Sequence, residues 1–268
     1  MRLTPDGARY LRMVAGEREQ LPFHLRWLLP RILGSSLLAW WLCTVISTVA
    51  VLAATWLLAD QHGLDPRHRW LAVALVAGLP AVRFAWRAPV LIDMPALACS
   101  AWVGALWPIA PEYALALSFI GAAICEKVPI FGALFAWSAW PLLALAAPLV
   151  RWLTVRAGEI RADDPLAETL RRPLATGLAA HAGRWRDPLL LLTPWGGCLL
   201  AMWAEPSWQL WLVLLVAYAQ LIVATDSVRL YQQAAPLVAI AAAMQVPADW
   251  ILPVILVHWF HPWAGEGI

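Results

Sequence analysis

The chain contains no charged residue from Ile32 to Ala59, a stretch of 28 residues. As a single helix this stretch would be about 42 Å long, which exceeds the roughly 30 Å of hydrocarbon in a bilayer. Only 13% of all residues are charged and 62% are hydrophobic, whereas soluble domains carry about 25% charged residues. The sequence therefore predicts an all-α, polytopic transmembrane helical bundle.

Further apolar stretches predict the number of crossings. Two of them, 113–125 and 250–260, are shorter than a full crossing and fit half-spans or re-entrant helices. Together with the first stretch, the full-length candidates give about seven full spans plus one or two half-spans or re-entrant helices. These further candidates are approximately 70–86, 90–108, 128–150, 188–204, 207–225 and 230–247.

The basic residues predict the orientation. Six of the 19 precede Ile32 and seven lie between Arg151 and Asp187, and cytoplasmic segments of membrane proteins are enriched in Lys and Arg. We therefore expect a cytoplasmic or interfacial amphipathic basic segment (1–31), a transmembrane bundle (32–150), a cytoplasmic Arg-rich loop (151–187) and a second bundle (188–268). One Lys against 18 Arg and no Asn is typical of a high-GC genome, which indicates a multi-pass protein of a bacterial inner membrane.

Charge and cysteine content exclude other classes of protein. The net charge is only +2 and no dense basic patch is present, so nucleic acid is not an expected partner. The four cysteines lie in apolar runs without the close pairing of a zinc site or disulfide framework. His258 and His261 could ligate a metal, but Pro262 interrupts a helix there and no further ligand cluster is evident. No cofactor is therefore indicated, and the expected partners are membrane lipids.

Ionisable residues near the spans are the candidates for function, because a charge at mid-bilayer costs about 3 kcal/mol. Arg83 and Arg87 share one helical face, with Asp93 following in a proline-flanked break. Such a group can bind a phosphate, the carboxylate orienting a guanidinium. The alternative is that both arginines reach the interface while Asp93 caps the helix that begins at Met94.

Three other places carry charges of this kind. Glu126 and Lys127 follow the short 113–125 run and either line a polar cavity or form an interfacial loop. A polar island between two later spans, with Asp226, Arg229 and Tyr231, is either a substrate-facing surface or a simple turn. The short loop after the first span holds two carboxylates, Asp60 and Asp65, for which a turn is the alternative.

Two segments resemble the GT-C superfamily of integral-membrane glycosyltransferases. Pro89–Ala98 (PVLIDMPALA) and Cys125–Trp137 (CEKVPIFGALFAW) are similar to the P-[VL]-L-[TV]-D-x-[PL]-A-L and [KR]-E-[TS]-x-[PL] segments that open two spans in many such proteins. The stretch from Ala224 to Pro236 resembles a later segment of relatives. The chain departs from the pattern in that Glu126 precedes Lys127, and in that its first outer loop has only about ten residues.

The resemblance implies an enzyme that transfers a sugar from a polyprenyl phosphate on the extracytoplasmic side. Asp65 or Asp60 would then be the general base. The residues expected to bind the lipid phosphate of the donor are Arg83, Arg87, Asp93, Glu126, Lys127, Asp226, Arg229 and Tyr231. The alternative is a non-enzymatic membrane protein, either a transporter or a subunit that has a membrane protein partner.

Overall fold

The computed structural model describes residues 3–17, 23–156, 192–203, 208–223 and 232–260. Within these ranges every regular element is a helix and no strand occurs. The prediction of an all-α chain is confirmed for them. Long apolar runs without a period-two polarity pattern favour helices over strands.

Helix α3 (Leu37–Gln61) forms from the long uncharged stretch. Among the described helices it alone is long and apolar enough to cross a membrane. Helices α4 (Pro66–Gly78) and α5 (Pro80–Arg87) meet the same criterion only when taken together, with a bend of 51° at their junction. Pro80, which follows the break, is a usual cause of such a bend. The structure thus shows one candidate span, or two if the bent pair is one span.

The described chain packs as two compact units. Unit 1 comprises residues 1–51 and 85–171, and unit 2 comprises 52–84 and 172–268. The sequence divides the chain at the Arg-rich loop 151–187, whereas the packing groups 52–84 with the described parts of the C-terminal region. Most of that loop, from residue 157 onward, lies outside the described residues.

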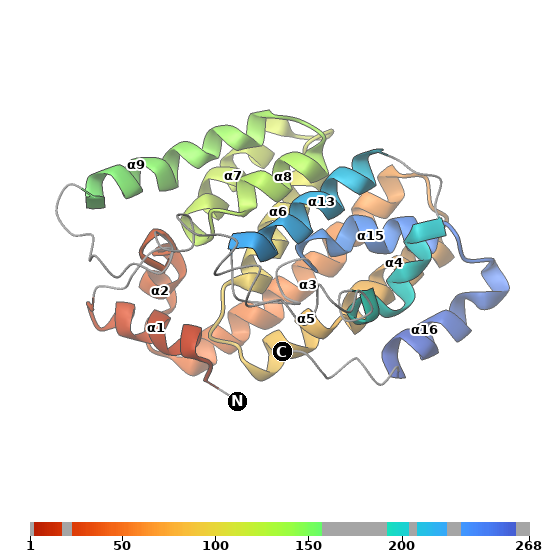
Figure 1. The fold of residues 1–268 in the computed structure, drawn as a ribbon, viewed down its shortest axis with the longest axis horizontal. Coiled ribbons are helices and arrows are strands. Elements are labelled where there is room, and N and C mark those ends of the chain that lie inside the picture. The colour runs from red at the N-terminus through yellow and green to blue at the C-terminus, as the bar shows by residue number, and fades with distance from the viewer. Residues whose placement is uncertain (1–2, 18–22, 157–191, 204–207, 224–231, 261–268) are drawn as a thin grey trace. The chain divides into compact units, whose positions relative to one another are not determined.

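The centre of unit 1 is a set of short apolar helices: α6 (Asp93–Leu106), α7 (Pro111–Ile124) and α8 (Val128–Ala136) (Figure 1). Helices α6 and α8 are parallel, because Gly104 of α6 packs on Phe135 and Val103 packs on Gly132. At Gly104 a Cβ atom would lie 2.4 Å from the Cβ of Phe135, so the two backbones approach at this glycine.

Helix α7 runs antiparallel to these two helices, since Gly121 near its end packs on Val128, the first residue of α8, and on Cys99 in the middle of α6. It has 14 residues, as many as α6. Helix α9 (Ala146–Arg156) follows a short 3-10 helix, η2 (Trp140–Leu145). The Ser118 hydroxyl of α7 donates to the Pro141 carbonyl, which joins α7 to η2. The chain therefore reverses direction at each connection from α6 to α9.

The N-terminal segment packs over one end of this set. It consists of α1 (Pro5–Val14), η1 (Phe23–Leu25) and α2 (Leu28–Leu33). Thr4 caps α1 by accepting from the Gly7 amide at 3.0 Å. A buried cluster joins the segment to the starts of α3, α6 and α8 and to the end of α7. Its members are Tyr10, Phe23, Leu29, Trp40, Val90, Ile92, Ala96, Ile124, Cys125 and Val128.

Unit 2 contains α4, η4 (Thr193–Trp203), α13 (Trp208–Val223), α15 (Ala235–Ala243) and α16 (Ile251–Phe260). Buried His258 bonds to two backbone groups. His258 accepts from the Gly197 amide through Nδ1 at 2.9 Å, and its Nε2 lies 2.7 Å from the Leu75 carbonyl. This geometry fixes a neutral ring with the proton on Nε2. A structural role for His258 follows.

Candidate functional site

Arg26 and Glu126 form a two-point ion pair in unit 1. Arg26 Nε lies 2.9 Å from Glu126 Oε2, and Nη2 lies 2.5 Å from Oε1. Arg26 sits between η1 and α2, and Glu126 lies in the connection between α7 and α8. The two side chains are only 13% and 27% exposed. A planar guanidinium matches the two carboxylate oxygens in this fork-to-fork geometry, so the pair fixes the N-terminal segment over the helix ends.

Aromatic rings surround the guanidinium. The Tyr10 hydroxyl accepts a long bond of 3.4 Å from Arg26 Nη1, and the Phe23 ring centroid lies 5.7 Å from the guanidinium carbon. Tyr10 itself is 1% exposed and stacks on Trp40 at 6.1 Å. These rings exclude water from one side of the ion pair, which strengthens its electrostatic attraction.

The ionisation states follow from this geometry. Burial on its own would raise the pKa of Glu126, but the charge and hydrogen bonds of Arg26 outweigh it and lower the pKa to about 2. Burial raises the pKa of Tyr10, and the nearby charge of Asp93 adds to that effect. At neutral pH the site therefore holds a carboxylate, a guanidinium and a neutral phenol. None of these groups is poised to exchange a proton there.

The structure brings together the two segments that resemble glycosyltransferases. Helix α6 begins at Asp93 and the parallel α8 begins at Val128, and residues of both segments share the buried cluster with Tyr10. Asp93 is the first residue of α6, and Ile92 occupies the N-cap position. A carboxylate in the first turn stabilises a helix through its dipole. Lys127 is half-buried beside Glu126.

The two predicted catalytic carboxylates lie at the turn between α3 and α4 in unit 2. Asp65 caps α4, accepting from the amides of Arg67 and His68 at 2.8 and 3.2 Å. His68 Nδ1 lies 2.5 Å from Asp65 Oδ2, and this bond is the main reason that the pKa of Asp65 is lowered. Asp60 pairs with Arg69 at 2.5 Å. Both carboxylates thus have the contacts expected of the alternative interpretation, a turn.

His68 joins this turn to the segment after α15. Its Nε2 lies 2.8 Å from the Val246 carbonyl while its Nδ1 faces Asp65. Both partners are acceptors, so the ring satisfies both only when it carries two protons. In that state it is an imidazolium paired with Asp65.

The guanidinium of Arg83 contacts the last turn of α16. Its Nη2 donates to the Trp259 carbonyl at 2.6 Å, and its guanidinium lies 5.4 Å from the Trp259 ring centroid. A cation at the last turn of a helix interacts favourably with the helix dipole. Asp65 precedes α4 and Arg83 follows it, and a 13-residue helix is about 20 Å long. The structure therefore does not bring Asp65 and Arg83 to one substrate group.

The remaining predicted site residues are placed as follows. Arg87 is exposed at the end of α5. Asp226, Arg229 and Tyr231 lie outside the described residues, as does His261. Among the described residues, no three His, Cys, Asp or Glu side chains are grouped so as to hold a metal ion.

Sequence reasoning missed Arg26 as a site residue, together with Tyr10 and His68. Arg26 and Tyr10 appeared only as members of an interfacial segment. A signal for Arg26 was present, because a carboxylate between two apolar runs, such as Glu126, needs a cation nearby. Nothing in the spacing identified which arginine, since Arg26 and Glu126 are 100 positions apart.

Comparisons with protein-family models, with curated proteins and with solved structures find no match.

Proposed function

We propose that the chain is a multi-pass protein of the bacterial inner membrane with its N-terminus in the cytoplasm. Exposed apolar faces support this location. On α3, Leu38, Ile46 and Val49 are 62%, 66% and 61% exposed, and α16 exposes Leu252 and Val257 in the same way. Apolar surface of this extent is normally covered by lipid or by another protein.

The alternation of helices in unit 1 supports the proposed orientation. Helix α3 starts at the end where the N-terminal segment packs, and four antiparallel passes from α6 to α9 lead from Asp93 back to the same segment. There Arg151 lies over the ring of Trp27 at 5.3 Å. Arg151, the first arginine of the second basic segment, thus lies at the same end of unit 1 as the N-terminal arginines, as the positive-inside rule requires. Helices α6 and α7 are each about 21 Å long. They can cross the bilayer only where it is locally thinner.

We further propose that the chain binds a polyprenyl-phosphate-linked sugar and transfers the sugar. The observation that carries this proposal is the meeting of the two glycosyltransferase-like segments at one end of unit 1. Arg26 already binds both oxygens of Glu126, and the neighbouring ammonium of Lys127 is the group that we propose to attract the phosphate. We also propose that the chain has about seven spans, the number that the sequence predicts.

A second candidate is a non-catalytic subunit of a membrane complex, and the contacts of the carboxylates favour it. Asp60 and Asp65 are engaged in the turn before α4. A carboxylate whose pKa is lowered, as in Asp65, is a weaker general base.

A transfer assay separates the two candidates. The purified protein is placed in liposomes with a labelled polyprenyl-phosphate sugar and an extract of cell-envelope acceptors. Transfer that falls by about 10²-fold or more in Asp60→Asn or Asp65→Asn supports the enzyme. Arg67→Gln, at an exposed position of the same turn, is the control. Absence of transfer, together with a stoichiometric partner in mild detergent, supports the subunit.

A further inference from the structure

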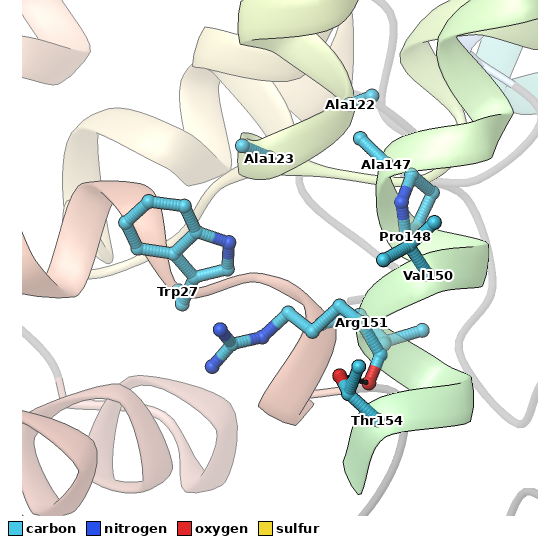
Figure 2. Close-up of a pocket in the computed structure, with 9 residues that line it drawn as sticks. Trp27, Ala122, Ala123, Ala147, Pro148, Val150, Arg151 and Thr154 are labelled. Carbon is cyan, nitrogen blue, oxygen red and sulfur yellow. Dashed lines mark hydrogen bonds between the residues drawn. The ribbon is translucent and has the colours of Figure 1, made fainter.

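A second feature of unit 1 is a cavity of about 310 Å³ beside α9 (Figure 2). Its volume is at the lower limit of pockets that bind small molecules. Some residues that line it are sequence neighbours of Arg26 and Glu126, but neither member of that pair lines the cavity. The residues that matter are Ala122 and Ala123 of α7, Pro148 and Val150 of α9, and Trp27, Arg151 and Thr154 at its rim.

Two guanidinium groups lie over the indole of Trp27, which lines the cavity. The guanidinium carbon of Arg151 lies 5.3 Å from the Trp27 ring centroid and that of Arg31 lies 6.0 Å from it. Figure 2 shows the Arg151 guanidinium turned toward Trp27. Guanidinium groups beside one ring can both donate hydrogen bonds to the oxygens of a bound phosphate.

The walls of the cavity and the surface beyond it are apolar. Alanine, proline and valine side chains line it opposite the arginine. Along α9 the apolar surface continues over Leu149, Val150 and Leu153, which are 52%, 58% and 53% exposed. A ligand that matches both parts has an anionic head and hydrocarbon chains.

We propose that this cavity binds the phosphate of an anionic membrane phospholipid of the phosphatidylglycerol type. The phosphate lies at the rim between Arg31 and Arg151, and the acyl chains follow the exposed face of α9. Free phosphate matches the rim but not the apolar face. This proposal requires that the chain resides in a membrane, but it does not depend on sugar transfer.

Native mass spectrometry of the full chain tests the proposal. The protein is reconstituted in nanodiscs with equal amounts of phosphatidylglycerol and phosphatidylcholine, then released and weighed with its retained lipids. We expect phosphatidylglycerol to be retained preferentially. Each of Arg31→Gln and Arg151→Gln should reduce this retention about fivefold, since one basic group near an anionic lipid contributes about that factor. Arg151→Lys should keep most of it.

Two further variants separate site binding from general charge attraction. Ala123→Phe leaves the charge unchanged and fills the cavity, so it should reduce retention as much as Arg151→Gln. Arg67→Gln removes an exposed charge in unit 2 and should leave retention unchanged. Circular dichroism establishes that each variant is folded. Equal retention of the two lipids, loss of retention in Arg67→Gln, or displacement of the lipid by millimolar inorganic phosphate would overturn the proposal.

Discussion

Arg26 holds Glu126 through two hydrogen bonds, of 2.9 and 2.5 Å, although the residues are 100 positions apart in the sequence. The bond joins the N-terminal segment to the connection between α7 and α8. Because Tyr10 and Phe23 lie against the same guanidinium, this one pair ties the amphipathic segment to the end of the helix set.

Loss of one member of this pair should destabilise unit 1. Glu126→Gln leaves Arg26 as a largely buried cation without a counter-charge, which costs about 2–3 kcal/mol, less than a fully buried pair would. Denaturant unfolding in detergent, followed by far-UV circular dichroism, measures this. The control is Asp6→Asn, which breaks the more exposed pair with Arg9 and should cost less than about 1 kcal/mol. Equal costs for the two variants would contradict a special role for Arg26 and Glu126.

The same pair predicts a dependence of stability on pH. The carboxyl of Glu126 titrates at about 2 in the folded chain, against 4.5 when unperturbed. A lowered folded-state pKa stabilises the fold above the unfolded-state value, so the contribution is complete above about pH 4.5. It is lost progressively as the pH falls toward 2. We expect the difference in unfolding free energy between wild type and Glu126→Gln to shrink over this interval; a constant difference would refute the assignment.

The close contact of α6 and α8 gives a packing prediction. Gly104→Ala would place a methyl group 2.4 Å from the Cβ of Phe135, so the helices must separate, at a cost of about 1–3 kcal/mol. Ala116→Val on the exposed face of α7 adds more volume without this clash and serves as control. Thermal unfolding of both variants in one detergent measures the effect. A wild-type midpoint for Gly104→Ala would show that the two helices are not in contact there.

Membrane topology can be checked by cysteine labelling. In a variant whose four native cysteines are replaced by alanine, Ser36→Cys should be labelled only from the cytoplasmic side. Glu112→Cys, at an exposed position, and Ser138→Cys, at a half-buried one, lie at the other end of the helices in unit 1 and should be labelled only from outside. Labelling of all three positions from one side would rule out the alternating passes.

The helical class predicted from the sequence is confirmed for the described residues, whereas the number of spans stays a prediction. An uncharged stretch as long as 32–59 can form few structures other than a helix in a bilayer. Helix α3 covers most of this stretch. Segments such as 111–124 and 128–136 form helices too short to identify as spans by length. Gly121 of the first packs on Val128 of the second, and Phe135 of the second packs on Gly104 of α6, and this pairing depends on the whole fold.

The candidate site was predictable only in part. Glu126 and Asp93 were found because a charge beside an apolar run is costly. The partner Arg26 was not found, because pairing over 100 positions leaves no local pattern. For Asp65 the N-cap interpretation could be made from Asp-Pro before a helix, since Pro66 is the first residue of α4. The separation of Asp65 from Arg83 required knowledge of the helix between them.

The proposal that the chain binds a polyprenyl-phosphate lipid is tested most directly by the lipid that stays with the purified protein. Protein extracted from its native membrane in mild detergent is analysed by mass spectrometry beside Lys127→Gln, with Arg67→Gln as control. We predict a polyprenyl phosphate or its sugar conjugate bound to wild type and to the control, and at least several-fold less on Lys127→Gln. Finding no polyprenyl species on wild type, or equal amounts on all three proteins, would contradict this proposal.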